Sequence, residues 1–261
     1  PADDSVVITG MGCCGVGGVG IAQLWQTFEN RTSCIGRVES AECRNHQAGV
    51  MPDVEWKKFI PSKFIRRIDE TAKAYLALGI GKGDHVTICM PNCPQAVDSF
   101  YALNRIGAIS NMIHPLSAAG EIRHYLDFSH SKAILTLDQF YTKVASVMPE
   151  LQNSDCKLLL ARIQDELPLA LAVGYDLTKA RKYPAPPRRG NYIWWSEFMR
   201  MGRRKNLPLP KKLPAANDCA SILYSGGTTG TTKGIMLSNL NFNALGLQTI
   251  AASGFAPIDG M

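Results

Sequence analysis

The sequence lacks a long hydrophobic run, a positively charged leader and any cysteine pair at metal-binding spacing. No apolar stretch approaches the ~18–20 residues that a membrane-spanning helix needs. Residues 1–4 contain two acids where a signal peptide carries positive charge, so we expect no secretion signal. Hydrophobic residues make up 46% of the 261 residues and charged residues 19%, which excludes a disordered charged protein. The composition favours a folded chain of one large domain or two small ones.

Eight cysteines are spread irregularly along the chain, and no Cys-x-x-Cys pair occurs. Cys89 and Cys93 lie four positions apart, and no His or Cys pair at a matching spacing accompanies them elsewhere. We therefore expect neither a metal site nor a disulfide framework. The prediction is a set of reduced, mostly buried thiols in a cytoplasmic protein without a membrane span.

The net charge of +6 is unevenly distributed, because residues 179–212 contain 11 Lys or Arg and a single acid, Glu197. Prolines and the aromatic residues Tyr192, Trp194 and Trp195 lie between these charges. Such a segment could bind a phosphorylated ligand or nucleic acid. The pattern favours a solvated, proline-rich loop with a short helix over 196–201, and nucleic acid is not a favoured partner.

Short apolar runs alternate with amphipathic stretches from residue 68 onward, which is the pattern of β-α-β units that build a parallel sheet. The predicted strands are 85–90, 108–113, 133–137, 157–163, 220–224 and 234–237. The predicted helices are 68–78, 94–106, 118–128, 140–148 and 239–252. Upstream, the sequence predicts a strand over 5–9 and a helix over 21–29. The fold class is therefore α/β, with a parallel-rich sheet and flanking helices.

The glycines at 10–15 fit the pattern G-x-G-x-x-G directly after the predicted strand 5–9. In a dinucleotide-binding fold these glycines let the backbone approach a pyrophosphate. Glycines continue through Gly20, and no second strand ends in an acid about 20 residues on. NAD binding is therefore not favoured.

Residues 5–70 resemble the start of a β-ketoacyl synthase, which has a thiolase-like fold. The motifs are V-V-I-T-G-M-G at 6–12, L-W at 24–25, S-C-I-G at 33–36 and R-R-I-D at 66–69. In that family these residues are scaffold, and the nucleophilic Cys and two His follow far downstream. The resemblance implies a short α/β segment over residues 1–67 and assigns no catalytic residue.

A loop of small residues between the strands 220–224 and 234–237 carries the strongest chemical signal. Its sequence is Y-S-G-G-T-T-G-T-T-K-G at 224–234. Glycines let backbone N–H groups turn toward phosphate oxygens, hydroxyls add donors, and Lys233 adds a positive charge. It is not a Walker A loop, because Lys233 does not directly follow a glycine.

These residues resemble the phosphate loop of the AMP-forming acyl-CoA synthetases and ligases, the adenylate-forming superfamily. The usual pattern is Y-[ST]-S-G-T-T-G-x-P-K-G, so Gly226 replaces a common Ser and Thr232 a common Pro. The resemblance implies that this loop binds the phosphates of ATP. The predicted phosphate-binding residues are Ser225, Gly226, Gly227, Thr228, Thr229, Gly230, Thr231, Thr232 and Lys233.

The resemblance extends over about residues 70–261 and includes M-P-N at 90–92 and H-P-L at 114–116. Asn239 replaces a His that helps to shape the acyl pocket in relatives. The resemblance implies that residues 68–261 form an incomplete N-terminal domain of an adenylate-forming enzyme. The implied reaction activates a carboxylic acid, of the fatty-acid class, with ATP and Mg²⁺ and transfers it to CoA or a carrier-protein thiol.

The family's adenine- and magnesium-binding segment, ribose-binding Asp, hinge and catalytic Lys follow the phosphate loop, and none of these motifs occurs in residues 1–261. We therefore assign no catalytic residue and expect the chain alone not to complete the reaction. Two alternatives stay open. They are a condensing enzyme of the β-ketoacyl synthase type, or its remnant, and a non-catalytic nucleotide-binding module.

Overall fold

The computed structural model describes residues 62–178, 183–188, 190–225 and 233–253, together with short strands within residues 1–61. The chain divides into two units, residues 62–239 and residues 1–61 with 240–261. In the second of these, β1 (Cys14–Gly15) pairs with β2 (Gly18–Val19), and β3 (Ile35–Arg37) pairs with β4 (Gln47–Gly49), both antiparallel. It also contains nearly all of α8 (Asn239–Ser253). The predicted strand 5–9 and helix 21–29 lie outside the described residues.

The unit of residues 62–239 is built on a seven-stranded sheet in the order β11-β10-β6-β5-β7-β8-β9. The neighbours from β10 to β9 are all parallel, and only β10 and β11 pair antiparallel. The parallel sheet that the alternation predicts is confirmed. The strands are β5 (His85–Cys89), β6 (Ile109–Met112), β7 (Ala133–Leu137), β8 (Lys157–Ala161), β9 (Ile193–Trp194), β10 (Cys219–Ser225) and β11 (Lys233–Ser238).

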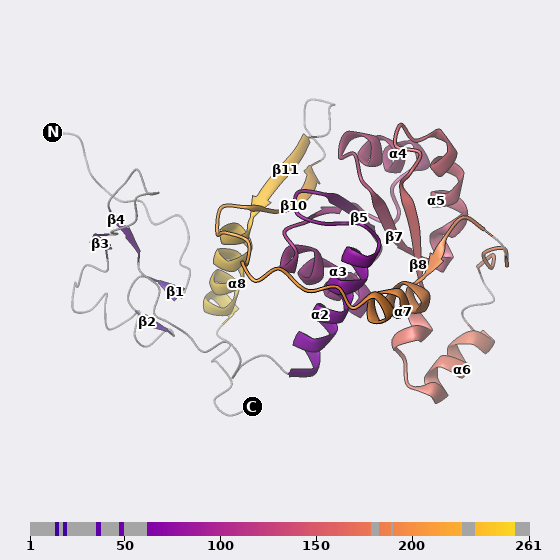
Figure 1. Cartoon of the computed structure of the whole chain (residues 1–261), viewed down its shortest axis with the longest axis horizontal. Helices are drawn as coiled ribbons and strands as arrows, with labels where there is room; N and C mark the ends of the chain where they lie inside the picture. Colours follow the sequence, from indigo (N-terminus) through magenta and orange to yellow (C-terminus); the bar gives the residue numbers. More distant parts are fainter. Residues whose placement is uncertain are drawn as a thin grey trace. The chain divides into compact units, whose positions relative to one another are not determined.

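Helices cover both faces of this sheet (Figure 1). One face carries α2 (Ser62–Ala77), α3 (Pro94–Arg105) and α7 (Trp195–Lys205), and the other carries α4 (Ala119–Phe128) and α5 (Tyr141–Val147). Another helix, α6 (Leu169–Thr178), follows a short 3₁₀ turn after β8. The chain passes from β5 through α3 to β6, and then through α4 on the opposite face to β7. This reversal beside β5 is a topological switch point, where α/β sheets bind ligands at their carboxyl edge.

Side chains of the central strands alternate between two apolar layers, because successive residues of a strand point to opposite faces. Leu135 and Leu159 pack in the layer beneath α2, α3 and α7. Ile134 and Leu160 pack in the layer beneath α4 and α5. All four are fully buried. Burial on both faces explains why these strands appear in the sequence as continuous apolar runs.

Helices α2 and α7 approach each other closely at Gly202. A Cβ atom on Gly202 would lie 2.6 Å from the Cα atom of Ala74. Beside this contact, the Tyr75 and Phe198 rings meet edge to face with their centroids 4.8 Å apart. The fixed packing of α7 on α2 turns the exposed side of α7 into a rigid surface.

The main differences from the predicted elements occur at the ends of this unit. Helix α2 begins at Ser62, six residues before the predicted helix and ahead of the predicted domain boundary at residues 67 and 68. That boundary stays a prediction. Helix α6 and strand β9 were not predicted from the sequence. The predicted helix over 196–201 is part of the longer helix α7.

Candidate functional site

The predicted phosphate loop connects the antiparallel strands β10 and β11. Strand β10 runs parallel to β6 and extends beyond the last pair between them, Leu223 with Met112. Its final residue, Ser225, therefore lies at the carboxyl edge of the parallel sheet. Ser225 pairs directly with Lys233, the first residue of β11, so both ends of the loop lie side by side. Gly226, Gly227, Thr228, Thr229, Gly230, Thr231 and Thr232 lie outside the described residues.

Two serine hydroxyl groups form hydrogen bonds between β10 and β6, next to the predicted phosphate loop. Ser110 Oγ donates a hydrogen bond to the Ala220 carbonyl at 3.2 Å, and Ser221 Oγ donates to the Ser110 carbonyl at 2.9 Å. Both serines are fully buried. These reciprocal bonds fix the strand that delivers Ser225 to the sheet edge.

Aromatic rings support the base of the loop from the side of α4. The ring of Tyr224, which precedes Ser225, stacks on the ring of Tyr125, and Phe128 contacts Tyr224 edge on. Gly234 lies against the same cluster, because a Cβ atom there would come within 3.3 Å of Phe128 and Ile222. A glycine after Lys233 therefore lets β11 pack closely against these rings.

A buried polar network lies next to the Tyr125 and Tyr224 rings. Asn111 Nδ2 on β6 donates to Thr87 Oγ1 at 2.8 Å and to Ser129 Oγ at 3.0 Å. The Ser131 hydroxyl closes the network, lying 2.7 Å from the hydroxyls of both Thr87 and Ser129. The network connects β5, β6 and the end of α4. It therefore links the helix that carries Tyr125 to the central strands of the sheet.

Burial raises the pKa of the Tyr224 hydroxyl to about 12, and the nearby Asn111 side chain offsets only part of this rise. Within the described part of the chain, Tyr224 Oη and Asn111 Oδ1 make no hydrogen bond of normal geometry. Tyr224 is therefore a neutral phenol at pH 7 that supports the loop through packing. Thr87, Ser110 and Asn111 are polar residues in otherwise apolar strands, which is the sequence signal that indicates such a buried network.

The segment after β6 is held beside the same edge of the sheet by Lys143, on α5. Its Nζ donates to the carbonyls of Pro115 at 3.3 Å and Ser117 at 3.0 Å. The H-P-L motif at 114–116 lies in this segment. Lys143 thus positions the loop in which the motif lies, a role that helical spacing alone did not reveal.

Asn239, the predicted acyl-pocket residue, bonds to the chain around the start of β10. Its Nδ2 donates to the Ala215 carbonyl at 3.0 Å, and its Oδ1 accepts a bond from the Asn104 side chain. Its backbone N–H donates to the Asp218 carbonyl at 3.2 Å. These bonds tie the end of β11 to α3 and to the turn that precedes β10. The role of Asn239 in an acyl pocket stays a prediction.

The described donors at the mouth of the hairpin are a hydroxyl and an ammonium group, a set that suits phosphate oxygens. Among the residues that the structure describes, no group of three or more His, Cys, Asp or Glu could hold a metal ion. In the same described ranges, no helix is long and apolar enough to cross a membrane.

A family model described as AMP-binding enzyme matches residues 42–257. The chain belongs to the AMP-binding enzyme family. This match confirms the resemblance carried by residues 70–261. It does not address the resemblance of residues 5–70 to β-ketoacyl synthases, which stays a prediction.

The relatives of this AMP-binding chain include fatty-acid ligases. It is 34% identical over 167 residues to a long-chain-fatty-acid–CoA ligase of Bacillus subtilis, covering 64% of this chain and 29% of the relative. It is 30% identical over 190 residues to the Salmonella typhimurium protein of that name, covering 69% and 32%. The chain thus spans less than a third of these relatives.

Among solved structures, the chain resembles a long-chain-fatty-acid-CoA ligase from Archaeoglobus fulgidus, with a TM-score of 0.56 and 24% identity. The match covers 80% of this chain and 36% of the other. A second match, to a putative long-chain-fatty-acid CoA ligase from Rhodopseudomonas palustris, has a TM-score of 0.55 and 19% identity, covering 74% and 41%. These matches confirm the predicted fold class, an α/β fold with a parallel-rich sheet and flanking helices.

Proposed function

We propose that residues 225–233 bind the β- and γ-phosphates of ATP, and that the chain is the nucleotide-binding first part of an AMP-forming acyl-CoA synthetase. The observation that carries this proposal is the pairing of Ser225 with Lys233 at the carboxyl edge of the parallel sheet. That edge is where α/β folds bind their ligands. Membership of the AMP-binding enzyme family supports the choice of ATP.

In the proposed reaction, a carboxylate oxygen of the acid attacks the α-phosphorus of ATP and pyrophosphate leaves. The thiol of CoA, or of a carrier protein, then displaces AMP from the acyl-adenylate. Lys233 and the hydroxyl of Ser225 would hold the outer phosphates while negative charge shifts onto the pyrophosphate. Mg²⁺, when bound with ATP, would neutralise part of the phosphate charge. Asp138, Asp218 and the other described acids form no metal-binding group, so no residue is assigned to it.

The substrate class we propose is a fatty acid, because the matching relatives carry the name long-chain-fatty-acid–CoA ligase. We place the reaction in the cytoplasm. Cys89, Cys93, Cys156 and Cys219 are free thiols, which suits a reducing compartment. Asn239 is proposed as a residue near the acyl pocket only because it occupies the position of the relatives' pocket histidine.

Calorimetric titration with ATP tests the proposed phosphate site. We expect the chain to bind ATP and Lys233→Ala to weaken binding by about 1–3 kcal/mol, because a charge-assisted contact is lost. Lys212→Ala removes the same charge from an exposed position outside the hairpin and should leave the affinity unchanged. Equal effects of the two substitutions, or no binding of ATP, would contradict the proposal.

Exchange of labelled pyrophosphate into ATP distinguishes an acid-activating enzyme from a non-catalytic nucleotide-binding module. We expect no exchange from the chain alone. Acid-dependent exchange should appear when the remaining part of a relative's sequence is supplied as one polypeptide with this chain. ATP binding without exchange in that extended protein would favour a non-catalytic nucleotide-binding module.

A further inference from the structure

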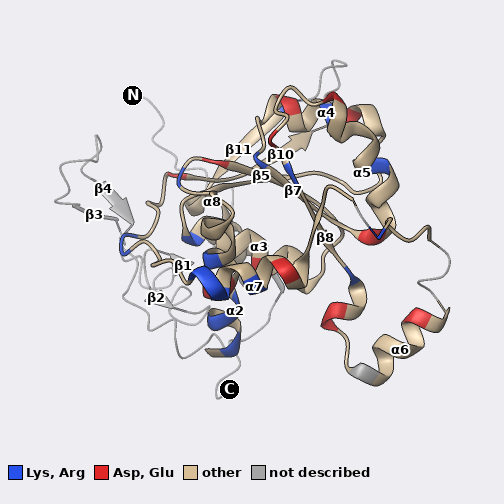
Figure 2. Ribbon diagram, turned by 45° about the vertical axis from the view of Figure 1, so that its right-hand side comes forward, with Lys and Arg blue, Asp and Glu red and all other residues tan. Residues whose placement is uncertain are grey.

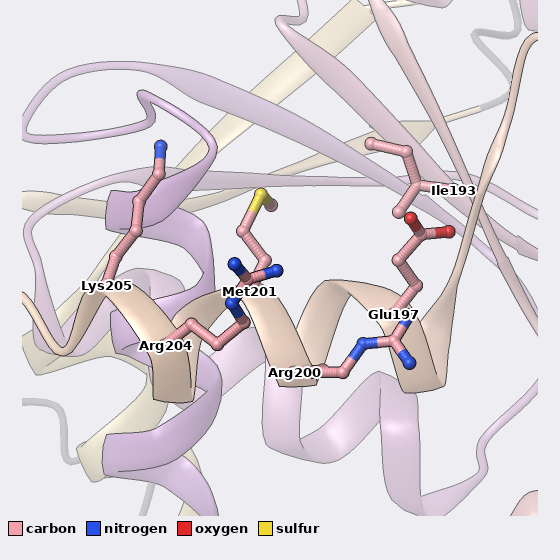
Figure 3. A pocket seen from close by; sticks show the side chains of 6 residues that line it. All are labelled: Ile193, Glu197, Arg200, Met201, Arg204 and Lys205. Carbon is pink, nitrogen blue, oxygen red and sulfur yellow. The ribbon is translucent and has the colours of Figure 1, made fainter.

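Residues of the basic segment 179–212, which the proposed function leaves unused, line a groove along α7. The groove has a volume of about 440 Å³ and is lined by side chains of β9 and α7 (Figure 3). Its volume lies within the range of small-molecule sites. The lining residues are Ile193, Glu197, Arg200, Met201, Arg204 and Lys205.

The charge in this groove comes from two arginines one helical turn apart. Arg200 and Arg204 are exposed, lie at positions i and i+4 of α7, and leave the helix on successive turns in Figure 3. Within the described residues, neither forms a salt bridge. Their neighbours differ. Arg203 lies 3.8 Å from Glu70, and Lys205 donates to the Ala77 carbonyl at 2.8 Å, where it caps the end of α2.

Part of the groove wall is apolar, and the helix that forms most of the wall is held firmly in place. Met201 and Ile193 supply the apolar lining, and the Glu197 carboxylate lies beside Ile193 in Figure 3. The close contact of Gly202 with Ala74 and the burial of Phe198 hold α7 in place. Figure 2 shows Lys and Arg segments, interrupted by acidic ones, around α2 and α7. Helix α7 itself carries four Lys or Arg and one acid, so an anion approaching it meets a positive field.

We propose that this groove is a binding site for a phosphate ester, held between the guanidinium groups of Arg200 and Arg204 with its organic part against Met201 and Ile193. Guanidinium groups bind phosphate oxygens through paired N–H donors, and two of them one turn apart can share one phosphate. The same chemistry is offered by a free phosphorylated metabolite and by the headgroup of an anionic phospholipid. The proposal is independent of ATP binding at residues 225–233.

Two measurements on the full chain test the site and the source of its phosphate ligand. One is titration with glycerol 3-phosphate, and the other is flotation with vesicles of phosphatidylglycerol or phosphatidylcholine. Binding of glycerol 3-phosphate in solution supports a free phosphorylated ligand. Binding only to phosphatidylglycerol vesicles supports a lipid headgroup. No binding of either phosphate probe would overturn the proposal. Equal binding to the two kinds of vesicle without binding of glycerol 3-phosphate would also overturn it.

Charge-matched variants separate a site from a general electrostatic effect. Arg200→Gln with Arg204→Gln should weaken binding of the phosphate probe about tenfold or more, since charge-assisted hydrogen bonds are lost. Arg203→Gln with Lys212→Gln removes the same charge outside the groove and should change binding less than about twofold. If both double variants weaken binding equally, the proposal fails.

Two further variants serve as controls. One distinguishes loss of binding from loss of folded protein, and the other tests whether the probe binds in the β10–β11 hairpin instead. Glu197→Gln removes the acid that lines the groove and should tighten binding, the opposite direction to any loss of folded protein. Lys233→Ala should leave binding of the phosphate probe unchanged. A loss of binding in Lys233→Ala would place the probe in the β10–β11 hairpin and overturn the α7 site.

Discussion

The rings of Tyr125 and Tyr224 stack with their centroids 4.0 Å apart and their planes 27° from parallel. Tyr125 belongs to α4 on one face of the sheet, and Tyr224 directly precedes the first residue of the predicted phosphate loop. The contact therefore joins the loop to a helix about a hundred positions earlier in the chain. Asn111 Nδ2 and Ser129 Oγ both donate hydrogen bonds to the Tyr125 carbonyl, so the aromatic support of the loop depends on buried polar groups.

Asn111→Ala should destabilise the protein, because Thr87 and Ser129 would lose the donor that they share in a buried site. We expect a loss of about 1–3 kcal/mol in the free energy of unfolding, measured by urea denaturation. Gln152→Ala, at an exposed position, should change it by less than about 0.5 kcal/mol. An unchanged urea midpoint in Asn111→Ala would show that the network does not support the fold.

Gly202→Ala should be strongly destabilising, since its Cβ would lie 2.6 Å from backbone atoms of Ala74 that cannot move aside alone. Overpacking of this kind typically costs about 1–3 kcal/mol. Gly174→Ala, also within a helix, meets nothing within 4 Å and should stabilise the protein by about 0.5–1 kcal/mol. Thermal denaturation of both variants measures these opposite shifts, and a stabilising effect of Gly202→Ala would contradict the described packing of α7.

The ion pairs of Arg67 connect α2 to α3 and to the turn after β8. Its Nε donates to Asp98 Oδ2 at 2.9 Å, and its Nη1 lies 2.9 Å from Glu166 Oε2. Burial raises the pKa of Asp98, and the hydrogen bonds and charge of Arg67 only partly reverse this rise. Burial lowers the pKa of Arg67, but its bonds to both acids outweigh this, so its pKa is raised overall. Asp98 is thus a buried carboxylate that depends on Arg67.

Arg67→Met should lower the free energy of unfolding at pH 7 by about 1.5–3 kcal/mol, because buried Asp98 loses its partner. The folded-state pKa of Asp98 is raised above its unfolded value, so folding binds a proton between these two values and stability from this group falls as pH rises.

Loss of Arg67 should raise the folded-state pKa of Asp98 further. The free energy of unfolding that Arg67→Met loses relative to the wild type should therefore become smaller as the pH is lowered toward the ordinary pKa range of Asp. Urea denaturation of the wild type and the variant across this pH range checks the sign. Adding Asp98→Asn to Arg67→Met should make the loss of stability independent of pH. A loss of stability in Arg67→Met that grows at low pH would contradict the prediction.

Cys89 and Cys156 should resist alkylation in the folded protein. Burial raises the pKa of each thiol to about 12, so almost no thiolate exists at pH 8. Mass spectrometry after brief iodoacetamide treatment should find both residues unmodified in the native state and fully modified in urea. Fast native labelling of either residue would instead point to a reactive nucleophile, as the condensing-enzyme alternative requires.

Much of the architecture could be predicted because local pattern and tertiary environment agree. Residues 133–137 are apolar except for Thr136, and the structure buries all of them as β7. Pro94 begins α3, where its missing N–H costs nothing. Strand β9 contains only Ile193 and Trp194, too short to show a period, and forms because β8 offers a free edge. The apolar start of α6 showed no clear amphipathic pattern in the sequence.

The sequence by itself determined the alternation of strands and helices, and the loop chemistry of residues 224–234, since both depend on residues near one another in the chain. Tertiary structure alone decided which distant residues meet. The strand order places β10 beside β6, and the packing of α4 brings Tyr125 under Tyr224. The contact of Gly202 with Ala74 likewise fixes α7 so that Arg200 and Arg204 line one groove. These contacts minimise exposed apolar surface for the whole unit, a quantity that no short stretch of sequence contains.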